Sequence, residues 1–150
     1  MAARFMVVQG VFVHGAPVPD WPGPGGTTVR SEAATGTAWT SWRLVGSNQR
    51  ELGRSARVFS NLETCIADAV AITASLDKAV LALSTRTSQW TWELTLDGEI
   101  VAVASRVYQR QRECEYNSRV FLVTAPIAQP LSIYVVPHPR FDLTLGATTE

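Results

Sequence analysis

Five arginines fall in two short polar segments, and each segment stands between an expected strand and an expected helix. The planar guanidinium group makes forked contacts to carboxylates and phosphates, and connections between elements carry binding residues more often than cores do. Arginines beside a helix N-terminus also add to its positive field. We therefore expect the binding residues to be Arg54, Arg57, Arg106, Tyr108, Arg110 and Arg112.

A competing interpretation of the same segments is a solvated connection in which Arg112 or Arg119 pairs with Glu113 or Glu115. Surface ion pairs of this kind contribute little to stability. No motif of nucleophilic, metal-dependent or phosphate-transfer catalysis is present: Gly-x-Ser-x-Gly, His-Glu-x-x-His and the Gly-x-x-x-x-Gly-Lys loop are all missing. We therefore expect no catalytic residue and no cofactor, and an enzyme is the least favoured class.

Cys65 and Cys114 are the two thiols of the chain. Two cysteines do not make a disulfide framework, and they are expected to be small buried residues on the inner faces of two helices. A disulfide between them, or a thiol activated by a helix start, is the alternative. The two histidines, His14 and His138, stand at no recognised ligand spacing, so no metal site is expected.

The overall composition excludes several function classes. Thirteen basic and thirteen acidic residues give a formal net charge of +0, which argues against a nucleic-acid binder driven by bulk charge. Only Lys78 of the basic residues is lysine, and GC-rich coding by itself produces such an excess of arginine over lysine. With 46% hydrophobic residues the chain is globular, and no apolar run approaches the roughly 18 residues of a membrane span. We expect a bacterial protein of the cytoplasm, with no membrane partner.

The first half of the chain is expected to contain strands, an insert and one helix. The strands are expected at 5–13, 39–45 and 51–58, and a Pro/Gly-rich insert at 15–36 separates the first two. Within that insert Trp21 is expected to dock on the domain, with an exposed interface anchor as the alternative. A capping box at Ser60–Glu63 begins the helix.

The second half repeats this pattern. Strands are expected at 79–84, 90–96 and 99–104, with a tight hairpin turn at Asp97-Gly98. A helix over 112–124 is stopped by Pro126, and a last strand is expected at 131–136. Trp42, Trp90 and Trp92 alternate with leucines, so they are expected on the sheet face beneath the helices rather than free to stack on bases.

Matched residues recur about fifty positions apart, which predicts an internal duplication. Trp42-Arg-Leu44 matches Trp92-Glu-Leu94, and Ser55 matches Ser105, at an offset of fifty. At an offset of forty-nine the matches are Phe59 with Tyr108 and Cys65 with Cys114. We therefore expect one pseudo-symmetric domain over 1–150, with repeats at about 1–78 and 79–136 and a tail at 137–150.

On these residues the chain resembles the YegP-like tandem-repeat proteins of unknown function. Their pattern is similar to Trp42-Arg-Leu44 with Asn48 and to Trp92-Glu-Leu94 with Asp97-Gly98. The resemblance covers about residues 37–125 and implies three strands, a helix and a further strand per repeat, with terminal strands exchanged between halves. The insert, Gln49 and the longer C-terminus depart from the pattern. The resemblance implies a fold and no reaction.

Together these patterns predict an α+β fold in which tandem β-β-β-α(-β) repeats form one largely antiparallel sheet with two helices on one face. The leading hypothesis for function is a non-enzymatic binding or assembly module for a protein partner, including a second copy of itself. The first alternative is an RNA or nucleic-acid accessory factor that uses the paired arginine connections. The second alternative is a small enzyme without a recognisable motif.

Overall fold

The computed structural model describes residues 2–18, 20–24, 26, 28–128 and 135–137, and it is an α+β fold. The first elements are strands β1 (Arg4–Val11), β2 (Ala38–Val45) and β3 (Glu51–Ser55), helix α1 (Leu62–Ala74) and the 3-10 turn η1 (Leu76–Lys78). They are followed by β4 (Val80–Arg86), β5 (Gln89–Leu96), β6 (Glu99–Val103), helix α2 (Gln111–Thr124), η2 (Ala125–Ile127) and β7 (Val135–Pro137).

The described strands form one sheet in the order β4-β5-β6-β3-β2-β1-β7. Every neighbouring pair from β4 to β1 is antiparallel, as the alternating sequence predicts. The two halves meet where β3 pairs with β6, with Arg54 opposite Val103 and Ser55 opposite Ala102. β7 runs parallel to β1, so the strand that follows α2 ends beside the first half of the chain. Residues 131–134 of the strand expected at 131–136 lie outside the described residues, as does almost all of the expected tail.

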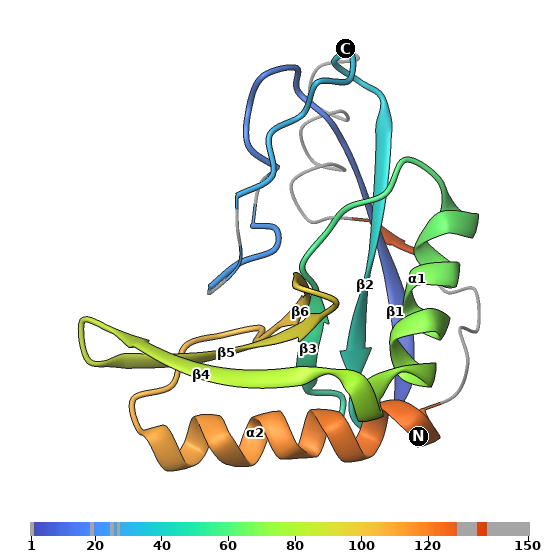
Figure 1. Ribbon diagram of the computed structural model, residues 1–150. Helices are drawn as coiled ribbons and strands as arrows, with labels where there is room; N and C mark the ends of the chain where they lie inside the picture. Colours follow the sequence, from blue (N-terminus) through green and yellow to red (C-terminus); the bar gives the residue numbers. More distant parts are fainter. Residues whose placement is uncertain (1, 19, 25, 27, 129–134, 138–150) are drawn as a thin grey trace.

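Both helices contribute to a single hydrophobic core with one face of the sheet. Trp42 and Trp92 are fully buried in this core, and so are Cys65 of α1 and Cys114 of α2. In Figure 1, α1 lies beside β1 and β2, while α2 runs along β4 and β5. The expected placement of the tryptophans under the helices is confirmed for this pair, and Trp90 packs partly buried against the same core.

The Pro/Gly-rich insert covers the opposite face of β1 and β2. Trp21 is buried against Trp39, with the ring centroids 5.8 Å apart, in a second cluster that also contains Val8. Side chains alternate between the faces of a strand, which places Val8 opposite Val7 of the main core. Gly10 makes room for this cluster, because a Cβ there would lie 2.5 Å from the Trp39 ring. The expected docking of Trp21 is thus confirmed.

The two helices begin differently. Asn61 caps α1, and its Oδ1 accepts the backbone N–H of Thr64 at 2.8 Å. The predicted capping box starting at Ser60 is therefore wrong by one residue, because the helix begins at Leu62 and its third position is Thr64. Arg110 stands at the N-cap of α2 and makes no side-chain capping bond. Among the described residues, neither helix is long and apolar enough to cross a membrane.

Candidate functional site

A groove of about 950 Å³ opens between the first half of α2, the turn from β2 to β3 and the segment that leads from β6 into α2. We call it the arginine groove. It combines charged, aromatic and amide side chains with an accessible surface that is mostly apolar. The lining residues are Asn48, Arg50, Glu51, Leu52, Ser105, Arg106, Tyr108, Arg112, Glu113, Tyr116, Asn117 and Val120.

Arg106 is held at the groove by an aromatic ring two residues further on. Its guanidinium carbon lies 5.1 Å from the centroid of Tyr108, within the range of a cation–π contact. Tyr108 is fixed in turn by a two-way backbone bridge to Trp90 of β5, with both N–H to O distances at 2.7 Å. Burial raises the pKa of Tyr108, and the charge of Arg106 opposes that rise. The Tyr108 phenol that contacts Arg106 is therefore neutral at physiological pH.

The first turns of α2 supply Arg112 and Tyr116 to the same groove. Residues four apart lie on one face of a helix, which is why both side chains reach it. Tyr116 is 71% exposed and Arg112 is also exposed. Within the described part of the chain, Arg112 makes no ion pair with Glu113; the pair that does form joins Arg119 to Glu115 at 3.3 Å, away from the groove.

Arg50 is a groove residue that the sequence interpretation missed. It stands in the turn from β2 to β3, where its backbone N–H donates to Oδ1 of Asn48 at 3.1 Å. Its carbonyl accepts the N–H of Gly46 at 2.8 Å, which closes the base of the turn. Arg106 lies 56 positions further along the chain, so only the pairing of β3 with β6 brings the two arginines to one groove.

The carboxylate of Glu51 at the groove floor is already neutralised. It accepts two hydrogen bonds from Arg54, at 2.7 and 3.0 Å, and one from the Ser105 hydroxyl at 2.7 Å. Arg43 approaches it at 3.5 Å as well. Glu113 is the other acidic residue of the lining. Positive charge is therefore in excess in the arginine groove, although the chain as a whole has a formal net charge of +0.

Arg54, one of the expected binding residues, is engaged inside the fold. Besides its bonds to Glu51, it donates to the carbonyl oxygens of Asp20 at 2.9 Å and Pro22 at 3.4 Å. Its guanidinium carbon also lies 4.2 Å from the centroid of the Trp21 ring. With five such contacts the side chain fastens the insert to the sheet, and it does not line the arginine groove.

Arg57 is engaged too, by two carboxylates. It makes a short ion pair with Asp68 of α1 and a longer one, 3.4 Å, with Glu99 of β6. Asp68 also accepts the indole N–H of Trp42 at 2.8 Å. Burial raises the pKa of the Asp68 carboxyl, while the Trp42 hydrogen bond and the charge of Arg57 oppose that rise.

The expected binding residues therefore divide into two groups. Arg106, Tyr108 and Arg112 line one groove, whereas Arg54 and Arg57 hold other parts of the fold together. Arg110 is exposed at the start of α2 but does not line the groove.

The cysteines are buried and free, as expected. Burial is the main cause that raises the pKa of Cys65 to about 12 and of Cys114 to about 11. Thiols with such pKa values stay protonated near neutral pH and are poor nucleophiles. No cluster of three metal-ligating side chains occurs among the residues that the structure describes.

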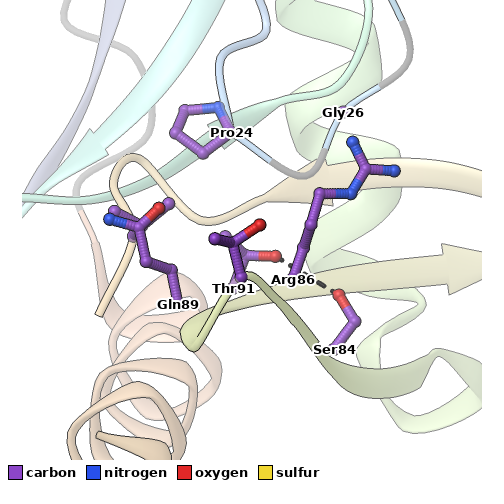
Figure 2. Close-up of a pocket in the computed structure, with 8 residues that line it drawn as sticks. Pro24, Gly26, Ser84, Arg86, Gln89 and Thr91 are labelled. Atoms are coloured by element: carbon purple, nitrogen blue, oxygen red, sulfur yellow. Dashed lines mark hydrogen bonds between the residues drawn. The ribbon is translucent and has the colours of Figure 1, made fainter. Parts of the chain in front are cut away.

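A smaller, polar pocket of about 410 Å³ lies between the insert and the hairpin of β4 and β5 (Figure 2). Arg86 and Gln89 border it, and the Ser84 and Thr91 hydroxyls are 3.4 Å apart along its side. Its lining carries one charged residue and no aromatic ring, so it offers less for recognition than the arginine groove does.

The fold defines a class: an antiparallel sheet with two helices on one face and a final strand returned to the first half. A solved structure of a UPF0339 protein from Shewanella oneidensis shares it with a TM-score of 0.52 and 6% identity, covering 91% of this chain and 93% of that one. The yegP protein of unknown function from E. coli is similar with a TM-score of 0.48 and 12% identity, covering 92% and 94%.

At 6% identity the similarity is one of fold, and it confirms at that level the resemblance to YegP-like proteins. No family model matches the chain, and no curated protein does.

Proposed function

We propose that the protein is a non-enzymatic binding module of the cytoplasm whose arginine groove captures an acidic, partly apolar segment of a partner protein. One observation carries the proposal. Arg50, Arg106 and Arg112 line a single groove, and none of the three has a carboxylate partner in the described part of the chain. Cations that the fold leaves unpaired at one concave surface favour an anionic ligand.

The composition of the groove favours a protein segment over a nucleic acid. Leu52 and Val120 give it apolar surface, which suits the apolar side chains of a peptide. Nucleic-acid affinity depends on neutralising many phosphates at once, and the chain has no net positive charge with which to do so. A peptide with acidic and apolar side chains matches this mixture.

The test is capture of partners from lysate, with and without nuclease, by the wild type and by matched charge-reversal variants. We expect Arg106→Glu combined with Arg112→Glu to abolish capture, because both side chains line the groove. Arg119→Glu reverses a charge on the same helix outside the groove and should leave capture unchanged. Capture that disappears on nuclease treatment would support the nucleic-acid alternative, and capture unaffected by the double variant would refute the groove.

A second copy of the chain is the other candidate partner, and the edge strand β4 favours it. β4 has no neighbour on its outer side among the described strands, and Val80 on it is 63% exposed. Unpaired edges of this kind are templates for strand addition. Light scattering across a concentration series should show dimers that Val80→Lys abolishes and Val123→Lys, an exposed change on α2, does not.

We also infer that the two halves are copies of one unit. Trp42 and Trp92 stand on β2 and β5, and Cys65 and Cys114 stand on α1 and α2. Both β2 with β3 and β5 with β6 show a register shift after the leucine of the repeated Trp-x-Leu motif. Superposition of the halves in an experimental structure tests the inference, since these pairs should coincide.

A further inference from the structure

Arg57 and Arg106 occupy matched places in the two halves. Each guanidinium lies near an aromatic ring two residues later, with its central carbon 6.0 Å from the Phe59 centroid and 5.1 Å from the Tyr108 centroid. Each ring belongs to a residue that forms a two-way backbone bridge to a strand. The bridges are Thr40–Phe59 and Trp90–Tyr108, with N–H to O distances of 2.7 Å throughout.

The helix residue beside each arginine differs between the halves. In the first half the indole N–H of Trp42 donates to Asp68, and the same carboxylate pairs with Arg57. In the second half the indole N–H of Trp92 donates to Oδ1 of Asn117 at 2.6 Å. Asn117 thus takes the place of Asp68 but carries no charge with which to hold Arg106.

The turn residue beside each arginine differs as well. Glu99, which pairs with Arg57, closes the base of the turn from β5 to β6 opposite Leu96. At the base of the turn from β2 to β3 the corresponding pair is Gly46 and Arg50. Arg50 therefore stands where Glu99 stands, and it lines the arginine groove together with Arg106.

These two exchanges put an amide and a guanidinium group beside Arg106, where Arg57 has two carboxylates. The formal charges of Arg57 and its two carboxylates add up to −1. Those of Arg106, Arg50 and Asn117 add up to +2. Because Oδ1 of Asn117 accepts from Trp92, its NH₂ group is left as a donor, and guanidinium groups only donate. The carboxylates that Arg57 finds within the fold are therefore missing beside Arg106.

We propose that this place is a carboxylate seat: an Asp or Glu side chain of the partner's acidic segment binds Arg106 and Arg50 beside Asn117, and it supplies the negative charge that Asp68 and Glu99 supply to Arg57. The inference rests on the proposed function and adds the chemistry of the ligand to it. The carboxylate accepts from two guanidinium groups and from the amide of Asn117, which are charge-assisted bonds of the stronger kind. Arg112 and Tyr116 then contact the residues that flank it.

The experiment adds the missing carboxylate to the protein itself. Asn117→Asp recreates the acceptor that Asp68 provides, and a carboxylate within the chain competes with any external one at high effective concentration. The probe is an acetylated peptide of alternating Glu and Leu, and the readout is the NMR signal of each arginine Nε–H. We expect the wild type to show a shift at Arg106, and Asn117→Asp to bind the peptide at least about tenfold more weakly.

A second variant and two controls make the result specific. Arg50→Glu restores the counterpart of Glu99 on an exposed turn, so it tests the same idea without a change near the core. Val123→Asp adds equal charge on the exposed side of α2 and should not weaken binding. A Gln–Leu peptide should not bind. Peptide affinity unchanged in both Asn117→Asp and Arg50→Glu, or equal binding of the Gln–Leu peptide or a uridine oligonucleotide, would overturn the carboxylate seat.

The same variants separate this inference from the proposed function. If lysate capture depends on Arg106 and Arg112 but survives Asn117→Asp and Arg50→Glu, the binding module stands and the carboxylate seat is wrong. If the wild type captures no partner while the acidic peptide binds as described, the seat stands and the proposed function is wrong.

Discussion

Arg54 lies over the indole of Trp21, with its guanidinium carbon 4.2 Å from the ring centroid. The same indole donates its N–H to the carbonyl of Ser55 at 3.1 Å. Two adjacent residues at the end of β3 thus hold a tryptophan that precedes them by more than thirty positions. The insert is thus fastened to the sheet by a cation–π contact and a hydrogen bond that share one indole.

Replacing Trp21 with alanine should lower the free energy of unfolding by about 3–5 kcal/mol, as large aromatic truncations in cores do. The change empties the cluster around Trp39 and leaves the Ser55 carbonyl without its donor. Urea denaturation measures the loss. Tyr116→Ala, at an exposed position, is the control and should change stability by less than about 0.5 kcal/mol. A Trp21→Ala protein as stable as the wild type would show that the insert contributes nothing to the fold.

Gly53 allows α2 to approach β3. A Cβ at this position would lie 2.7 Å from the Phe121 ring and 2.8 Å from the Trp92 ring. Gly53→Ala should therefore destabilise the protein by about 1–3 kcal/mol, the usual effect of overpacking. Thermal and urea unfolding provide the measurement. In a double-mutant cycle Phe121→Leu should relieve part of the loss, and strictly additive effects would argue against the clash.

The two thiols should be inert while the protein is folded. Because burial raises the pKa of Cys65 to about 12 and of Cys114 to about 11, native protein should react with a thiol reagent far more slowly than unfolded protein at mildly alkaline pH. The thiolate is disfavoured in the fold, so stability is kept below the ordinary thiol pKa of 9.0 and falls as pH rises above it. Fast native labelling, or a melting temperature that drops with reductant, would contradict this.

Asp68 should make the fold more stable toward acid. Its pKa is raised above 3.8 in the folded protein, chiefly by burial, so the folded state takes up the proton before the unfolded state does. As pH falls from above the folded pKa toward 3.8, the wild type should gain stability relative to Asp68→Asn. Urea unfolding of both proteins at neutral and at mildly acidic pH measures the difference. The opposite slope would mean that Arg57 outweighs burial.

The repeated Trp-x-Leu motif predicted much of the fold, because alternation within a strand is a local property that the sequence displays directly. Trp42 and Trp92 lie on the helix-covered face as expected, and Asp97-Gly98 forms the expected turn, with φ values of 52° and 81°. The start of α1 was misplaced by one residue because Ser60 and Asn61 are both good caps.

Only part of the candidate site could be predicted from the sequence. Arg106 and Arg112 stand close together in the chain, so their cluster was visible, but Arg50 joins them only through the pairing of β3 with β6. Arg54 and Arg57 are arginines too, but Arg54 lies at the end of β3 rather than in the connection that follows it. Their partners, Trp21 and Asp68, come from the insert and from α1, and no local pattern indicates those contacts.

The insert covers part of the sheet, and this coverage determines which strands tolerate polar substitutions. β1 and β2 lie between α1 on one face and the insert on the other, and most of their successive residues are buried. β4 packs against α2, and its residues alternate between exposed and half-buried from Val80 to Ser84, after which the strand is exposed. In a saturation mutagenesis screen for folded protein, β1 and β2 should reject polar residues at their buried apolar positions on both faces. β4 should accept them everywhere except at Leu81 and Leu83, so the map of tolerated positions would show which part of the sheet the insert covers.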